Sequence, residues 1–364
     1  MLHPFKRKLI KFKRILLPTL IVGVFFVAII ILMRFFSPYY NFARENNLSL
    51  SFFQSLIFDK KPDLKEYKGR TNVVLLGISG GSHEGGDLTD TIIFASTDFA
   101  KKEVTVVSVP RDVWLPSLKD RINSAYHYGE EKKPGGGLIM AKAAVEEVLG
   151  QPVQYGLLIN FSGFEKVIDL IGGVDIDVEK SFTDKLYPIE GKENDTCGTD
   201  KTFACRYETL VFEKGIQHMD GKLALKYVRS RHAEGEEGTD FARGRRQQQV
   251  ILAVKNKIIT QKLWKDFNLM KKLYEVFMQN VTTDLNWSEK ILLGKFFLTM
   301  LGDSVRQLVL DTGDSEQKRK GYLINPPAWQ YKDMWVLTPR SGDFAEIQKY
   351  ISCQLESPSC ELKP

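Results

Sequence analysis

The sequence holds few of the residues that build zinc, thiol and triad centres. Its 364 residues include only five histidines and four cysteines. The cysteines form no C-x-x-C motif, and no histidine lies at metal-ligand spacing from them. No Ser/His/Asp or Cys/His arrangement can be argued from spacing either. Loop or surface roles are therefore expected for the histidines, which are His3, His83, His127, His218 and His232.

Two nucleotide-binding motifs are also missing. A long glycine-rich loop, ISGGSHEGGDLTD at residues 78–90, follows an expected strand. Such a loop can cradle phosphate, but this one lacks the Gly-Lys-Ser/Thr of a P-loop and the glycine spacing of a Rossmann fold. Nucleotide binding by either motif is therefore rejected. No internal repeat or low-complexity run is present.

A general excess of positive charge is absent outside the first 14 residues. The formal net charge is +6, and residues 1–14 carry six Lys/Arg and no acidic residue. The remainder holds 45 basic and 45 acidic residues. No nucleic-acid partner is expected for such a balanced surface, although a local basic site is compatible with it.

One long hydrophobic run follows the basic tail. Ile15–Met33 spans 19 uncharged residues and would cover ~28 Å as a helix, close to the thickness of a bilayer core. We prefer an uncleaved anchor to a cleaved signal peptide, whose apolar region is shorter, and to a buried core helix. The positive-inside rule then predicts a cytoplasmic tail at 1–14, a transmembrane helix at 15–33, a juxtamembrane linker at 34–70 and an extracytoplasmic body.

The cysteines fall into two close pairs, Cys197 with Cys205 and Cys353 with Cys360. Two short disulfide-closed loops fit an oxidising exterior, in agreement with the expected topology. The spacing alone leaves the pairing open.

Alternating strand and helix patterns predict an α/β fold, with a central β-sheet covered by helices in a three-layer α/β/α arrangement. The first three strands are apolar enough to be buried on both faces. We expect a catalytic domain at 71–262, with an irregular insertion at 181–214, and a C-terminal extension or small domain at 263–364. The expected strands are 72–77, 91–96, 104–109, 155–160, 174–178 and a late one at 334–339; the expected helices are 136–149, 162–171, 219–227 and 241–259.

A cluster of arginines surrounds a glycine-rich acidic loop at residues 233–238. Arg229 and Arg231 are two residues apart, so extended backbone directs both side chains to one face. Asp240 is expected to cap the following helix. Guanidinium groups bind phosphate in forks, and helix N-termini favour anions, so the cluster fits a polyphosphate cradle. A solvated charged face paired with the nearby glutamates explains the composition equally well.

Within the expected helix, Arg243, Arg246 and Gln247 stand at i, i+3 and i+4 and are predicted to share one face. Arg245 and Gln249 are predicted to point elsewhere.

Several separated motifs together resemble the LytR–CpsA–Psr family. They are NVVLLG, the aspartate of TDTIIF, SVPRD, INSAYHYG, INFSGFEKVIDLIGGVDIDV, MDGKLALKYVRSRH and DFARGRRQQQ, in that order over about residues 70–258. The resemblance implies an extracytoplasmic phosphotransferase that moves a glycopolymer from a polyprenyl-pyrophosphate carrier to peptidoglycan. It also implies a helix-covered sheet with a pocket for the lipid, and Mg²⁺ as the metal.

The resemblance carries over to single residues. Asp90 matches an aspartate that coordinates the metal, and Arg111 matches a catalytic arginine that contacts pyrophosphate. The remaining matches are to pyrophosphate-binding positions, less securely for Arg121: Arg121, Arg229, Arg231, Arg243, Arg246 and Gln247. Asp240 matches the first residue of the same motif.

The glycine-rich loop departs from the family pattern. Many members have an aspartate where this chain has Ser79, and many have an arginine just before the metal-binding aspartate, where this chain has Leu88 and Thr89. We therefore consider Asp87 as a replacement metal ligand, with a turn-capping role as the equal alternative.

Three hypotheses follow for the function. The first is a membrane-anchored, Mg²⁺-dependent glycopolymer phosphotransferase. The second is a polyprenyl-pyrophosphate hydrolase that uses the same site, and the third is a non-catalytic wall-associated binding module or attenuator. The presence of both arginine groups together with Asp90 disfavours the third.

Overall fold

The computed structural model describes residues 30–34, 37, 40–41, 44, 64–81, 85–189, 191–192, 195–300, 305–314, 319–357 and 360. The chain divides into two compact units, Met1–Lys60 and Lys61–Pro364, and the fold below is that of the second. Residues 15–29 of the expected transmembrane helix lie outside the described residues. Among the residues that are described, no helix has the length and hydropathy needed to cross a membrane.

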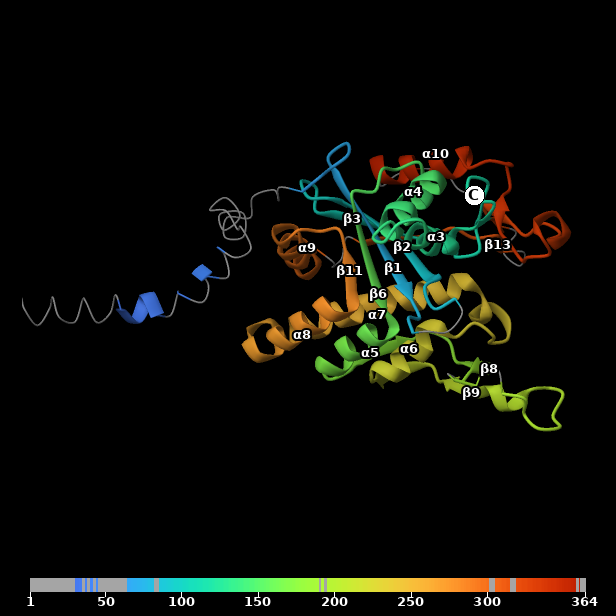
Figure 1. Ribbon diagram of the computed structural model, residues 1–364, viewed down its shortest axis with the longest axis horizontal. Helices are drawn as coiled ribbons and strands as arrows, with labels where there is room; N and C mark the ends of the chain where they lie inside the picture. Colours follow the sequence, from blue (N-terminus) through green and yellow to red (C-terminus); the bar gives the residue numbers. More distant parts are fainter. Residues whose placement is uncertain are drawn as a thin grey trace, which may run out of the picture. The chain divides into compact units, whose positions relative to one another are not determined.

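The second unit is built around a six-stranded mixed sheet of order β11-β6-β1-β2-β3-β12 (Figure 1). The three apolar strands expected first in the chain are confirmed as its centre, where β1, β2 and β3 pair antiparallel. Strands β6 and β12 join them in parallel, and β11 adds antiparallel to β6. The strands are β1 Arg70–Ile78, β2 Thr89–Asp98, β3 Glu103–Ser108, β6 Tyr155–Asn160, β11 Val281–Thr283 and β12 Val305–Val309.

Helices cover both faces of this sheet, as expected from the apolar strands. One face carries Val74, Phe94 and Val107, which are fully buried in a core shared with three helices. The opposite face carries Leu75 and Ile93 and packs against a long helix and the segment after β11. The helices are α3 Ala125–Lys132, α4 Gly137–Leu149 and α10 Ala345–Glu356 on the first face, and α7 Asp240–Thr260 and α9 Trp287–Met300 on the second.

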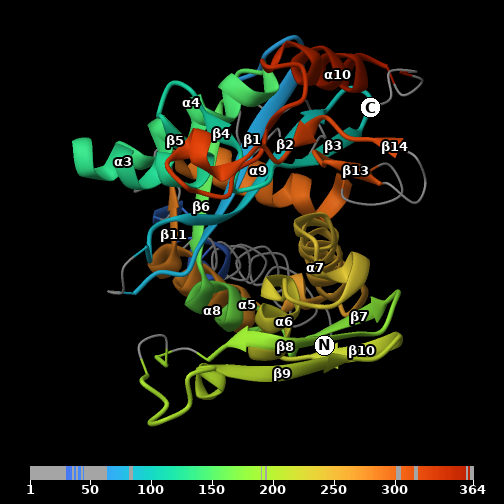
Figure 2. The same ribbon diagram turned by 90° about the vertical axis from the view of Figure 1, so that its right-hand side faces the viewer.

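A second hydrophobic core lies beyond α7 (Figure 2). The expected insertion at 181–214 is more regular than predicted, because it forms an antiparallel hairpin closed by the Cys197–Cys205 disulfide. The strand expected at 174–178 is present but pairs with β10 in a separate two-stranded sheet. Its alternating buried and exposed residues suit a sheet with one solvated face. These elements are α5 Phe161–Leu170, α6 Gly221–Arg229, α8 Phe267–Asn280, β7 Val174–Val178, β8 Phe182–Pro188, β9 Tyr207–Phe212 and β10 Gly215–Met219.

Residues 263–364 are part of the same compact unit as the sheet. They supply its two edge strands, β11 and β12. They also contain the chain's second cysteine pair, which forms the Cys353–Cys360 disulfide. The late strand expected at 334–339 is reduced to a short pairing. The remaining elements are β4 Trp114–Leu115, β5 Asp120–Arg121, β13 Gly313–Asp314, β14 Arg319–Lys320, β15 Leu323–Ile324, β16 Thr338–Pro339 and the 3₁₀ turns at 122–124, 204–206, 235–238, 263–265 and 328–331.

Candidate functional site

A polar pocket of about 150 Å³, which we call the arginine pocket, lies at one end of the sheet. Its walls come from the starts of β2 and α5, the loop after β3, strand β8, the end of α6 with the segment after it, and the first turns of α7. Six of the site residues predicted from the sequence line it, although more than 100 residues separate some of them. They are Asp90, Arg111, Arg229, Arg231, Arg243 and Gln247.

Asp90 and Arg111 form an ion pair in the wall of this pocket. The pair remains partly open to solvent, with 28% of the Asp90 side chain exposed. On its other side Arg111 reaches the buried carboxylate of Asp112, with Nε 3.4 Å from Oδ2. Arg121 donates to the same carboxylate at 2.9 Å and does not line the arginine pocket. Arg121 therefore supports Arg111 through Asp112.

Aromatic rings orient Arg229 in the pocket. Its guanidinium lies 4.4 Å from the ring centroid of Phe161 and 5.8 Å from that of Tyr187. Stacking on an aromatic face leaves the edges of a guanidinium available to an anion. Phe161 begins α5 and Tyr187 belongs to β8, so two separate elements hold this arginine.

Asp184, which the sequence reasoning missed, holds the irregular segment that follows α6 and contains Ser230 and Arg231. This fully buried carboxylate accepts hydrogen bonds through Oδ2 from Ser230 Oγ at 2.7 Å, from Arg231 N at 3.1 Å and from His232 N at 3.2 Å. Its Oδ1 accepts from Leu186 N. No spacing signal in the sequence links it to residue 230, because the hairpin alone brings them together.

Arg246 departs from the prediction. It is 2% exposed, does not line the arginine pocket, and donates to the carbonyls of Tyr227 and Ser230 and to Glu237 Oε2 at 2.9 Å. Burial lowers the pKa of this guanidinium, and the Glu237 carboxylate opposes the shift. Arg246 thus stabilises the end of α6 and the segment after it, and its side chain does not face the arginine pocket.

The helical geometry explains this departure. At about 100° per residue, position 247 lies roughly 40° from position 243, whereas position 246 lies roughly 60° away on the other side. Gln247 and Arg243 therefore share the pocket face, and Arg246 turns toward α6. Arg245 is exposed and pairs with Glu237 at 3.3 Å, away from the pocket as predicted.

The predicted cap of α7 is wrong by one residue. Thr239 is the N-cap, since its side chain accepts from the backbone N–H of Ala242 at 3.2 Å. Asp240 is the first helical residue.

In the described part of the glycine-rich loop, residues 78–81 and 85–90, no second carboxylate lies beside Asp90 in the pocket walls. Asp87 Oδ2 lies 2.7 Å from His127 Nδ1 and is absent from the pocket walls. This hydrogen bond raises the pKa of His127. Ser79 donates to the carbonyl of Gly86. Asp87 is thus paired with His127 of α3 in this arrangement.

The donor set at the arginine pocket nevertheless fits a hard divalent cation. Mg²⁺ is bound through one or two carboxylates together with waters and substrate phosphates, and Asp90 offers such a carboxylate. Among the described residues, one group of three His, Cys, Asp or Glu side chains is close enough to share an ion, and two of its members are the disulfide-bonded Cys197 and Cys205. Asp90 therefore stands as the pocket's candidate metal ligand.

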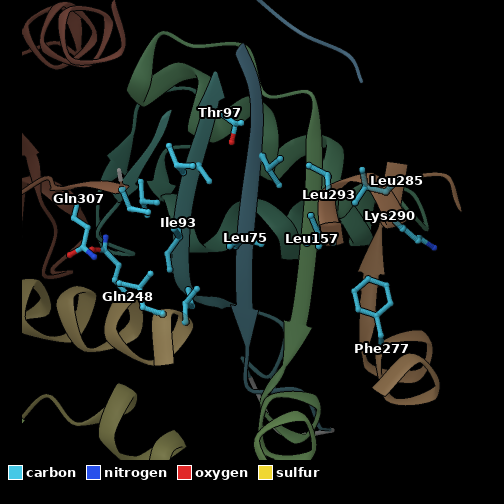
Figure 3. A pocket seen from close by; sticks show the side chains of 18 residues that line it. Leu75, Ile93, Thr97, Leu157, Gln248, Phe277, Leu285, Lys290, Leu293 and Gln307 are labelled. Carbon is cyan, nitrogen blue, oxygen red and sulfur yellow. The ribbon is translucent and has the colours of Figure 1, made fainter. Parts of the chain in front are cut away.

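An apolar cavity of about 300 Å³ lies on the same face of the sheet (Figure 3). Strand β2 connects the arginine pocket with this cavity. Thr91 lines the pocket, and Ile93, Ala95 and Thr97 line the cavity. Residues two apart on a strand face the same side. The pocket and the cavity are therefore successive positions along one face, which we call the binding face.

Helix α7 crosses this binding face from pocket to cavity. Near its start Gln247 Nε2 donates to Thr91 Oγ1 at 2.8 Å, and one turn later Ile251 and Leu252 line the cavity. The arrangement can hold a molecule with a multiply charged anionic head and a long apolar tail, because the arginines neutralise the head and the cavity buries the tail.

Known proteins resemble this chain in sequence and in fold. A polyisoprenyl-teichoic acid–peptidoglycan teichoic acid transferase, TagU of Bacillus cereus, is 28% identical over 237 residues, which cover 64% of this chain and 66% of TagU. The corresponding TagT of Bacillus subtilis is 29% identical over 290 residues, covering 76% of this chain and 80% of TagT. A solved structure, TagT bound to LIIa-WTA, superposes with a TM-score of 0.53 at 25% identity over 80% of this chain and 94% of that one. The model of the LytR_cpsA_psr family matches residues 41–335, and the chain accordingly belongs to the LytR–CpsA–Psr family.

Proposed function

We propose that the protein is a phosphotransferase that moves a glycopolymer from a polyprenyl-pyrophosphate carrier to peptidoglycan. The observation that carries the proposal is the continuity of the binding face, which joins the arginine pocket to an apolar cavity of about 300 Å³. A polyprenyl pyrophosphate has the matching shape, with several negative charges at one end of an apolar chain. The relatives named as teichoic acid transferases support the same reaction class.

In this proposal the arginines bind and orient the donor. Arg229, Arg231 and Arg243 surround the pyrophosphate, and Arg111 reaches it from the end of β3. The oxygen of the acceptor hydroxyl forms a bond to the sugar-linked phosphorus, and the bond from that phosphorus to the bridging oxygen breaks. Polyprenyl phosphate leaves with the bridging oxygen, and the hydroxyl proton is released to water. Charge that develops on the leaving phosphate is neutralised by guanidinium groups fixed in advance, which is the main catalytic requirement of such a transfer.

Asp90 would hold Mg²⁺, which when bound neutralises phosphate charge and helps to orient the donor. Its partner Arg111 keeps the carboxylate at the pocket wall. Asp87 is a weaker candidate for the metal because its carboxylate is engaged by His127.

We further propose that the protein works at the outer side of the cell membrane, anchored by residues 15–33 with residues 1–14 in the cytoplasm. The two disulfides support an oxidising compartment for the folded unit.

The test uses the purified full chain, a polyprenyl-pyrophosphate-linked oligosaccharide, Mg²⁺ and a muramic-acid-containing peptidoglycan fragment. Mass spectrometry should find the oligosaccharide phosphate attached to the fragment, together with free polyprenyl phosphate. Release of oligosaccharide phosphate into water at the same rate with and without the fragment would identify a hydrolase instead. Unchanged donor in every reaction, with or without metal, would support a non-catalytic binding module.

A further inference from the structure

One polar side chain is buried in the wall of the apolar cavity. Gln248 is 3% exposed and lines the cavity beside Ile251 and Leu252 of the same helix. Its Nε2 donates to Ser108 Oγ at 3.0 Å. Its Oε1 is buried and has no hydrogen-bond partner within the part of the chain that the structure describes. Because buried polar atoms in native proteins are nearly always paired, this amide is a candidate for contact with a ligand.

The Gln248 amide lies between the charged pockets around Asp90 and the apolar cavity. Ser108, its partner, also lines a small pocket together with Asp90, Thr91 and Arg243. Gln247, the preceding residue, lines the arginine pocket. Gln248 therefore lines the cavity while its neighbour in the chain and its hydrogen-bond partner line the two pockets around Asp90, and Figure 3 shows Gln248 at the edge of the cavity.

The Ser108 hydroxyl permits either orientation of the amide. A hydroxyl both donates and accepts, so it can accept from Nε2 or donate to Oε1. Turning the terminal torsion of Gln248 keeps the bond to Ser108 and presents the N–H groups to the cavity. In that orientation the residue offers a donor to a phosphate oxygen at the cavity entrance, and no buried acceptor is left unpaired.

We propose that Gln248 is a specificity-determining residue that hydrogen-bonds the lipid-proximal phosphate where the isoprenoid chain enters the cavity. The cavity then selects prenyl phosphates over uncharged prenols of the same length. This inference rests on the proposed function, because it concerns the donor of that reaction.

The chain offers a matched control in Gln307 of β12. This glutamine also lines the cavity, but its side chain is exposed and it does not line either pocket around Asp90. Methionine preserves the length of glutamine and removes the amide, so Gln248→Met and Gln307→Met make the same chemical change at two places.

The experiment measures the binding of geranylgeranyl pyrophosphate and of geranylgeraniol to the full chain and to both variants. The readout is the ratio of the two dissociation constants. Gln248→Met should lower the preference for the pyrophosphate about tenfold, as expected for one hydrogen bond to a charged group, and should retain affinity for the alcohol. Gln307→Met should leave the ratio within about twofold of the wild-type value.

Thermal unfolding shows whether Gln248→Met is folded, and a second variant tests the same contact if it is not. Gln248→Glu retains an acceptor for the Ser108 hydroxyl but places negative charge beside the phosphate, so it should lower the ratio by more than tenfold. An unchanged ratio in a folded Gln248 variant, with normal pyrophosphate binding by the wild type, overturns the inference and leaves the proposed function standing. Absence of pyrophosphate binding by the wild type contradicts the proposed function itself.

Discussion

The arginine pocket and the apolar cavity share one face of one sheet but are built from different parts of the chain. The pocket is made by strand ends, loops and the first turns of α7. The cavity is made by the interiors of β1, β2, β3, β6 and β12, by the middle of α7, and by residues of α8 and α9. Strand interiors must bury apolar residues to stabilise the fold, whereas strand ends can carry charge because side chains and solvent reach it there. The division between head group and lipid therefore follows from sheet architecture.

The largest expected effect is a loss of turnover that leaves lipid binding intact. Asp90→Ala should abolish Mg²⁺-dependent turnover and retain lipid binding and fold, because it removes one carboxylate at the start of β2 from the pocket and nothing from the cavity. Turnover with added Mg²⁺ and binding of geranylgeraniol would be measured on the same preparation. Wild-type turnover in Asp90→Ala would place the metal elsewhere.

The second prediction compares two adjacent arginines of α7. Arg246→Ala should lower the free energy of unfolding by about 3 kcal/mol, since it leaves three backbone carbonyls without their donor and removes the buried partner of the Glu237 carboxylate. Arg245→Ala, at an exposed position, should change it by less than about 0.5 kcal/mol. Urea unfolding of the two variants is the measurement. Equal losses would mean that Arg246 is no more structural than its neighbour.

The third prediction tests the pocket without touching the cavity. Arg111→Ala should weaken pyrophosphate binding about tenfold or more, because charged hydrogen bonds contribute ~1.5–3 kcal/mol each. Arg111→Lys should restore part of this, since lysine supplies charge without the planar fork. Isothermal titration with geranylgeranyl pyrophosphate gives the constants. Unchanged binding by Arg111→Ala would show that the proposed head-group site is misplaced.

A fourth, reciprocal change tests the cavity alone. Ala95→Trp would fill the space between β2 and α7, so it should weaken binding of the long-chain pyrophosphate severalfold. Dimethylallyl pyrophosphate, whose short chain would fill much less of the cavity, should lose much less affinity. Equal weakening of both ligands would mean that the substitution disturbs the pocket as well.

The smallest expected effect concerns Asp87 and His127. Their hydrogen bond raises the pKa of His127 above its ordinary value of 6.5, so the pair stabilises the fold at low pH and loses this contribution as pH rises through the raised value. The melting temperature of Asp87→Asn should therefore lie below that of the wild type at pH 6 and approach it at pH 9. Normal Mg²⁺ dependence of turnover in this variant would exclude Asp87 from the metal site.

Much of the architecture could be predicted from local patterns. The three central strands are continuous apolar runs, and a glycine in the left-handed region ends the helix that precedes β6, at Gly150. Most of the pocket residues could also be predicted, because the family motifs carry them. The edge strands β11 and β12 could not, since β12 pairs in parallel with a strand about 200 residues earlier and no local signal records that pairing.

The sequence by itself determined the central strands, the main helices and the positions of the charged side chains, because apolar periodicity and arginine spacing are local properties. Only the tertiary structure decided that Arg243 and Gln247 face the pocket while Arg246 is buried, and that Asp184 holds Ser230 across 46 positions. Only the tertiary structure placed the arginine pocket and the cavity on one face of the sheet. These outcomes depend on which surfaces of the sheet and helices pack against each other. That packing is decided by the burial of apolar side chains from all parts of the chain, which no local pattern records.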